Sequence, residues 1–163
     1  MSLFYPDLLI AKITDISYDM LYKLDIKTIL LDVDDTISPK GASSISKEIL
    51  EWINIIKSHS VGLVILSNNS LSRVKSLSQK IEVPCICRSM KPFPWSIHKA
   101  MKLVSADKSK TAIIGDQIFT DVLAAKLSGI KSILVEPMDM DGDFMLKFKR
   151  KLECLIKSRW SKQ

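Results

Sequence analysis

Short apolar runs rich in β-branched residues alternate along this chain with longer segments of helical periodicity. Each run is bounded by polar or turn-forming residues, as buried strands are. The runs predict strands at residues 27–33, 61–67, 84–89, 110–116 and 131–137. The segments between them predict helices at residues 44–59, 70–81, 94–105 and 120–129. Strands buried on both sides and joined by helices form parallel sheets, so the sequence predicts an α/β fold.

Length and composition predict one domain over residues 1–163. Apolar residues make up 47% of the chain and charged residues 26%, which is typical of a globular protein. No apolar run approaches the ~20 residues of a membrane-spanning helix. The first 20 residues lack the basic and uninterrupted apolar regions of a secretory signal, so we expect a cytoplasmic protein.

The chain carries a net charge of +6, which favours an acidic partner such as a phosphorylated substrate, an anionic lipid or a nucleic acid. Much of the excess lies in residues 141–160, where apolar side chains recur at helical spacing among lysines and arginines. This segment is predicted to be a basic amphipathic helix of the same domain. It fits a last helix packed on the sheet, and it also fits peripheral contact with an anionic membrane.

Polar side chains follow four consecutive predicted strands, each at the point where the strand ends. In parallel sheets these ends meet at one edge, where ligands bind. In chain order the residues are Asp32, Asp34 and Thr36, then Ser67 and Asn68, then Lys91, and finally Asp116 and Asp121.

These residue types fit phosphoryl transfer. Asp32 and Asp34 flank a single residue, and two such close carboxylates need either a proton or a cation between them. Mg²⁺ prefers oxygen ligands, and Asp116 from another strand end would complete its site. One carboxylate could attack phosphorus while a second, protonated, serves the leaving oxygen. Ser67 and Lys91 could then hold the phosphoryl oxygens.

Four segments carry a resemblance to a known family. "DVDDT" at 32–36, "VILSNN" at 64–69, "KP" at 91–92 and "GDQIFTD" at 115–121 resemble, in order, the four motifs of the haloacid dehalogenase superfamily of phosphotransferases. The resemblance implies a Rossmann-like three-layer αβα sandwich around a mostly parallel sheet. It also implies a Mg²⁺-dependent phosphatase.

The resemblance assigns a role to each of these residues. It implies Asp32 as the nucleophile and Asp34 as general acid and base, with the Asp34 main-chain carbonyl on the metal. Asp116 would be a further metal ligand, with Asp121 near or supporting the metal site. Ser67, Asn68 and Lys91 are predicted to bind the substrate phosphate, and Thr36 to help fix the loop.

The spacing of the motifs leaves no room for a cap domain. Only 35 positions separate Asp32 from Ser67 and 24 separate Ser67 from Lys91, so the chain resembles the capless subclass III. A narrower resemblance is to YqeG-type phosphatases. It is carried by residues 4–36, by the "SNN" at 67–69 and by the segment after residue 134. These phosphatases are related to a mitochondrial phosphatidylglycerophosphate phosphatase. Asp35 stands where such proteins often have Asn.

The similarity implies a phosphorylated small molecule or a phospholipid head group as substrate, and nucleic acid is not expected. Two other functions stay open. A receiver-type signalling domain uses similar residues, but its phosphoacceptor sits on the middle strand, and here the middle strands are expected to end in Ser67 and near Lys91. A non-catalytic module could bind RNA or membrane through a basic face.

Ordinary structural roles would also explain single residues. Ser67 and Asn68 could cap a helix, Lys91 could lie on the surface, and Asp121 could interact with a helix dipole. Phe93 and Trp95, beside Lys91, could border the substrate or pack in the core.

Overall fold

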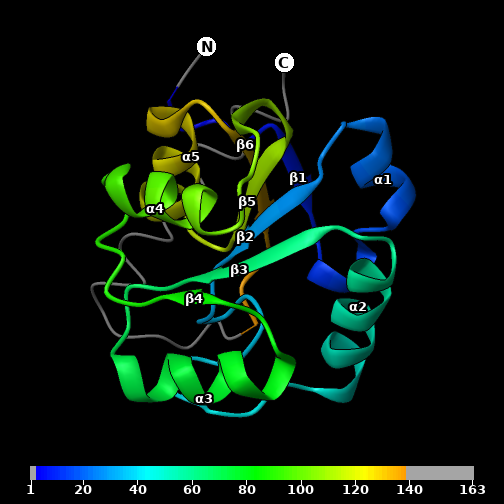
Figure 1. Ribbon diagram of the computed structural model, residues 1–163, viewed down its shortest axis with the longest axis vertical. Helices are drawn as coiled ribbons and strands as arrows, with labels where there is room; N and C mark the ends of the chain where they lie inside the picture. Colours follow the sequence, from blue (N-terminus) through cyan, green and yellow to red (C-terminus); the bar gives the residue numbers. More distant parts are fainter. Residues whose placement is uncertain (1–2, 139–163) are drawn as a thin grey trace.

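The computed structural model describes residues 3–138, which form one parallel six-stranded sheet between helices (Figure 1). All neighbouring strands pair in parallel, in the order β1-β6-β5-β2-β3-β4. The predicted α/β class is therefore confirmed. The strands are β1 (Leu8–Ile10), β2 (Thr28–Leu31), β3 (Gly62–Leu66), β4 (Cys85–Ile86), β5 (Thr111–Gly115) and β6 (Lys131–Val135).

The four predicted helices are present, each within a few residues of its predicted ends. Ser46 caps α2, because its hydroxyl accepts a hydrogen bond from the Ile49 amide at 3.3 Å. Gly129 ends α5 in the left-handed conformation, with φ of 66°. The helices are α1 (Tyr18–Lys23), α2 (Lys47–Ser58), α3 (Leu71–Ile81), α4 (Trp95–Leu103) and α5 (Leu123–Ser128), with short turns η1 (Ile13–Asp15), η2 (Lys108–Lys110) and the π-helical η3 (Ile118–Val122).

Among the strands and α-helices, two were not predicted, β1 and α1. Each is too short to show a periodic pattern, with three and six residues. The run Leu8–Ile10 becomes a strand because it pairs with β6 at the edge of the sheet, a contact across more than 120 residues.

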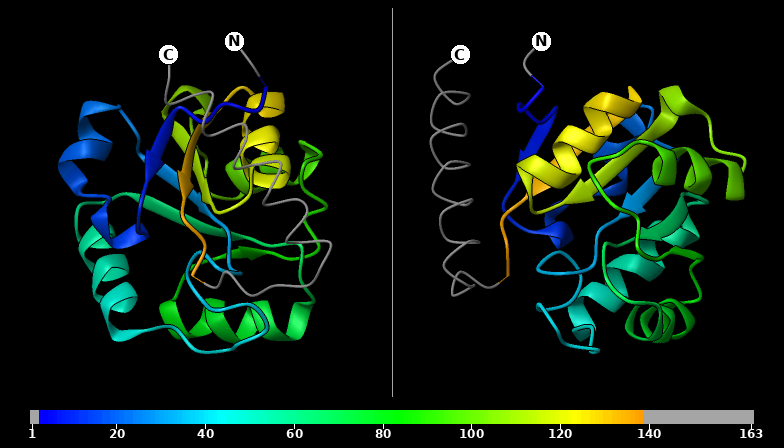
Figure 2. Two further views of the ribbon diagram at one scale, coloured as in Figure 1. Left: turned by 180° about the vertical axis from the view of Figure 1, so that it is seen from behind. Right: turned by 90° about the vertical axis from the view of Figure 1, so that its left-hand side faces the viewer.

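The sheet is buried on both faces, which gives the predicted three-layer αβα sandwich. Successive residues of β2 point to opposite faces. Ile29 and Leu31 pack in the core beneath α2 and α3, whereas Leu30 packs with α4 and α5. Figure 2 shows the sheet between these two layers. Residues 3–138 contain no cap domain over the carboxyl ends of the strands, as the motif spacing predicted.

The strand order corrects one expectation. The middle of the sheet is formed by β5 and β2, and not by the strands before Ser67 and Lys91. Chain order does not fix spatial order, because each helical connection can cross to either side of the strand before it. Asp32 therefore follows a central strand, and the prediction that the middle strands end in Ser67 and near Lys91 is wrong.

The predicted basic helix at 141–160 lies outside the described residues, and so does Cys154. Cys85 and Cys87 are free and half-buried, with 3.9 Å between their sulfur atoms, and both pack against the core. Among residues 3–138 no helix is long and apolar enough to cross a membrane.

Candidate active site

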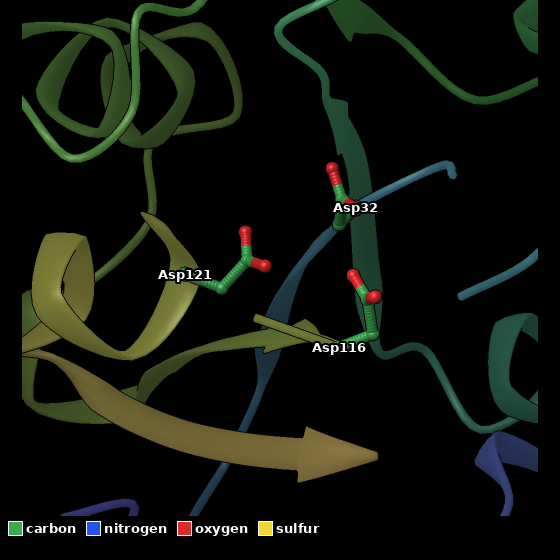
Figure 3. Close-up of side chains that lie close together, drawn as sticks. All are labelled: Asp32, Asp116 and Asp121. Carbon is green, nitrogen blue, oxygen red and sulfur yellow. The ribbon is translucent and has the colours of Figure 1, made fainter. Parts of the chain in front are cut away.

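Three buried aspartates converge at the carboxyl edge of the sheet. Asp32 directly follows β2 and Asp116 directly follows the neighbouring β5, so parallel pairing places them side by side. Asp121 reaches the same place from η3 (Figure 3). One carboxylate oxygen from each residue lies within 4.8 Å of the others. The tertiary fold thus brings together three of the acids that the sequence assigned to one site, from three separate positions in the chain.

Lys91 neutralises part of this cluster. Its Nζ lies 2.5 Å from Asp32 Oδ1 and 2.6 Å from Asp121 Oδ1, and only 2% of its side chain is exposed. The surface position that is ordinary for a lysine is therefore excluded. A buried ammonium group needs such partners, because burial of an unpaired charge is costly.

Burial and charge shift the pKa values of this pair. Burial raises the pKa of Asp32 from its ordinary 3.8 to about 7, because desolvation outweighs the opposing effect of the Lys91 charge, and the Asp121 charge raises it further. Burial alone would lower the pKa of Lys91, but Asp121 and Asp32 together raise it above its ordinary value. Lys91 therefore keeps its proton at neutral pH, while Asp32 titrates near neutrality.

Asn68 holds the loop that carries Lys91. Its Oδ1 accepts hydrogen bonds from the Lys91 amide at 2.8 Å and the Ser89 hydroxyl at 2.7 Å. Its Nδ2 donates to the Lys91 carbonyl at 3.3 Å. These contacts engage the amide group that was predicted to bind phosphate, and they favour a positioning role for Asn68.

Ser67 is buried directly after β3, and its Oγ accepts a hydrogen bond from the Asn69 amide at 3.2 Å. The residue at the N-cap of α3 is Ser70. The alternative role of Ser67 and Asn68 as helix caps is therefore excluded, and the Ser67 hydroxyl is left with a proton to donate.

Asp34 lies outside the acidic cluster and has its own cation. Arg73 Nη1 is 2.5 Å from Asp34 Oδ1, and Asn69 Nδ2 donates to Asp34 Oδ2. The Gly41 amide donates to Asp34 Oδ1 at 3.3 Å. Asp32 and Asp34, which are close in the sequence, thus pair with different basic side chains, Lys91 and Arg73.

Arg73 also fixes the loop between β2 and α2. Its Nε donates to the Ala42 carbonyl at 2.5 Å and its Nη2 to the Pro39 carbonyl at 3.2 Å. Neither Arg73 nor the role of Asn69 was predicted from the sequence. In the sequence Arg73 is one of several basic residues on α3, and nothing in the spacing distinguishes it from Lys75 or Lys80.

Asp121 is held on both carboxylate oxygens. Oδ1 accepts from Lys91, while Oδ2 accepts from the Gln117 amide at 3.2 Å and the Thr120 hydroxyl at 3.3 Å. These contacts fit the supporting role predicted for Asp121 and favour the positioning of Lys91. Gly115 makes this placement possible, because a Cβ atom there would overlap the Asp121 carboxyl group.

Thr36 is buried, and its hydroxyl has no hydrogen-bond partner within residues 3–138. Its side chain lines a hollow of about 500 Å³ that also borders residues 11–14 and 136–138. The loop is instead fixed through the main chain, where the Thr36 amide donates to the Val33 carbonyl at 3.3 Å.

Comparisons with known proteins define the class. The chain is 31% identical over 155 residues to the probable phosphatase YqeG of Bacillus subtilis, covering 95% of this chain and 90% of that protein. Together with the fold and the four motifs, this makes the chain a phosphatase of the haloacid dehalogenase type, a phosphoric monoester hydrolase. The family model described as mitochondrial PGP phosphatase matches residues 1–138. The chain belongs to this family.

Further similarities are more distant. The chain is 22% identical to the chloroplastic/mitochondrial phosphatidylglycerophosphate phosphatase 1 of Arabidopsis thaliana, and the match covers 95% of this chain and 47% of that protein. Among solved structures, the cobalt-bound deoxy-D-mannose-octulosonate 8-phosphate phosphatase of Haemophilus influenzae has a TM-score of 0.57 at 16% identity. It covers 78% of this chain and 77% of the other, and shows a shared fold.

Replacement of Gly115 by alanine tests the packing of Asp121. The methyl group would displace the Asp121 carboxylate and with it Lys91, so we expect phosphatase activity to fall about a hundredfold. Gly62→Ala is the matched control, since its Cβ would meet no atom closer than 3.4 Å. Equal activity of the two variants would contradict the packing argument.

Replacement of Arg73 by methionine tests the loop anchor. The change removes three side-chain contacts to residues 34–42, so we expect kcat to fall by about tenfold or more while the protein stays folded. Lys75→Met, on the exposed side of the same helix, should leave kcat unchanged. Steady-state kinetics on a soluble phosphomonoester decides between these outcomes.

The raised pKa of Asp32 predicts how the stability of the metal-free protein changes with pH. Between the ordinary 3.8 and about 7 the folded state keeps a proton on Asp32 that the unfolded state has lost. This contribution to the free energy of unfolding therefore falls as pH rises through that window and is constant above it. We expect Asp32→Asn to lose this component in urea titrations with EDTA, whereas Asp19→Asn, at an exposed acid, should keep it.

Proposed function

We propose that the protein is a Mg²⁺-dependent phosphatase that works through a phosphoryl group on Asp32, with the phosphorylated head group of a phospholipid as its substrate. The observation that carries this proposal is the position of Asp32. It lies at the end of a central strand, 2.5 Å from the buried Lys91 ammonium and beside Asp116.

The residues present fit a magnesium ion. Asp32 and Asp116 are buried, adjacent and supply hard oxygen ligands, and the Asp34 main-chain carbonyl follows in the same loop. When bound, the ion would neutralise the phosphate and orient it for in-line attack. Asp121 already accepts hydrogen bonds on both oxygens, so we assign it to Lys91 rather than to direct metal contact.

The first step forms a bond from an Asp32 carboxylate oxygen to phosphorus as the ester P–O bond breaks. The leaving oxygen takes a proton from Asp34. In the second step Asp34 takes a proton from water, whose oxygen attacks phosphorus, and the Asp32–phosphorus bond breaks to release inorganic phosphate. Arg73 and Asn69 hold Asp34 in place for both proton transfers.

Lys91 and Ser67 would hold the transferred phosphoryl group. The Lys91 ammonium stays charged at neutral pH and lies against the nucleophile, where negative charge builds up in the transition state. Ser67 offers its hydroxyl proton at the end of the neighbouring β3. Asn68 keeps the two loops in register, through its hydrogen bonds to Ser89 and Lys91.

The choice of a lipid rests on similarity and on access. The family model and the Arabidopsis relative are both described as phosphatidylglycerophosphate phosphatases, and residues 3–138 place no cap over the site. An uncapped site can admit a bulky substrate. Soluble sugar or nucleotide phosphates are the competing substrates in the test below.

Release of inorganic phosphate tests the proposal, with small phosphomonoesters and with phosphatidylglycerophosphate in mixed micelles. We expect activity only with Mg²⁺, and a loss of at least about a thousandfold in Asp32→Asn. Asp35→Asn is the matched control, because Asp35 lies in the same loop but has no assigned role. Retained activity in Asp32→Asn would exclude the phospho-aspartate, and a preference for soluble esters would exclude the lipid substrate.

Metal binding gives an independent readout. Mg²⁺ at 100 times its Kd should raise the free energy of unfolding by about 2.7 kcal/mol. At the same Mg²⁺ concentration the increase should be much smaller in Asp116→Asn, because this change removes a proposed metal ligand and leaves the nucleophile in place. An equal increase in both proteins would place the ion elsewhere.

A further inference from the structure

Large apolar side chains lie exposed around the loop that delivers Lys91 to the site. Met90, Phe93 and Trp95 are 58%, 60% and 46% exposed, although they lie next to the buried Lys91 in the sequence. The loop lies between β4 and α4 (Figure 1). The same backbone therefore directs a charge inward and apolar groups outward.

Leu71, on the neighbouring segment of the chain, is a further exposed apolar residue. It begins α3 and is 50% exposed. The two segments are joined by a hydrogen bond from the Arg88 amide to the Asn69 carbonyl at 3.1 Å. We call Leu71, Met90, Phe93 and Trp95 the apolar rim. Exposed apolar groups gathered at one place mark interaction surfaces more often than scattered ones do.

The segment that carries most of the apolar rim is basic. Between residues 83 and 106 the chain has no acid and four basic residues: Arg88, Lys91, Lys99 and Lys102. Lys91 is buried in the site, whereas Arg88, Lys99 and Lys102 are exposed.

We propose that the apolar rim docks onto the surface of an anionic phospholipid bilayer, with Phe93 and Trp95 inserted among the lipids. The proposal rests on the phosphatase function proposed above, and it explains how an uncapped site reaches a phosphate at a lipid surface. Such a protein surface matches an anionic bilayer, because the apolar and aromatic groups can enter the acyl region while the basic groups attract the charged lipid head groups. Leucine and methionine offer no base-stacking face, so a nucleic acid fits the rim less well.

Co-sedimentation of the full chain with vesicles tests the proposal. The vesicles contain phosphatidylcholine alone or mixed with phosphatidylglycerol, which has no phosphomonoester and so is not hydrolysed. We expect binding to the mixed vesicles only, and at least about a tenfold loss of affinity in the double variant Phe93→Ser/Trp95→Ser. Tyr22→Ser is the control, since Tyr22 is an exposed aromatic residue at the opposite end of the sheet.

Tryptophan fluorescence locates the inserted group. Quenching by brominated phosphatidylcholine in the mixed vesicles should disappear in Trp95→Phe while binding is retained. Quenching that persists in this variant would overturn the proposal, because it would come from a tryptophan outside the rim.

Two other results would overturn the proposal. One is unchanged vesicle binding in the double variant, which would place the contact elsewhere, for example in the basic segment 141–160. The other is tighter binding to single-stranded oligouridylate than to vesicles. Hydrolysis of p-nitrophenyl phosphate separates failure of the membrane proposal from failure of the proposed function. The double variant should keep wild-type activity in this assay. An inactive wild-type protein would refute the phosphatase function, and vesicle binding could still be measured.

Discussion

The buried ammonium group of Lys91 connects the parts of this site. It lies between Asp32 and Asp121, and each of the three groups would be costly to bury alone. Its placement depends on an amide side chain, Asn68, that holds the Lys91 main chain from the next strand. It also depends on the absence of a side chain at Gly115, which admits Asp121. The acidic cluster is therefore packed and partly neutralised by a side chain of the protein itself.

The two neighbouring acids of the first motif have different environments, which divides their roles. Asp32 is buried beside Lys91, and its pKa is raised to about 7. Asp34 is held at the edge by Arg73 and Asn69. The first environment suits a nucleophile whose charge is matched by cations at the reaction centre. The second fixes the position of Asp34, the acid to which we assign the proton transfers.

Within residues 3–138 no cap domain separates the proposed phosphate-binding residues, which are buried, from the surface of the protein. The segment after β4 connects the two, because it contributes Lys91 to the interior and Phe93 to the exterior. If the rim binds a bilayer as proposed, recognition of the surface and of the phosphate both depend on one short loop. The basic residues between positions 83 and 106 would then attract the enzyme to the same anionic surface.

The sequence by itself determined the class of fold and indicated which polar residues meet at one edge of the sheet. Buried strands alternating with helices require a parallel sheet, and the polar residues after them must meet at its carboxyl edge. The four motifs in order were enough to indicate the enzyme class and the absence of a cap. These features are local in the chain, so pattern and spacing express them directly.

Only the tertiary structure decided which strands are central, which cation partners which acid, and which apolar residues stay exposed. The positions of β1 and β2 in the sheet follow from pairing between distant segments, and α1 was too short to predict. Arg73 reaches Asp34 across 39 residues, and Lys91 reaches Asp32 across 59. Phe93 and Trp95 could have packed in the core, and instead they are exposed at the surface. Such outcomes depend on packing in three dimensions, which the spacing of residues along one chain does not specify.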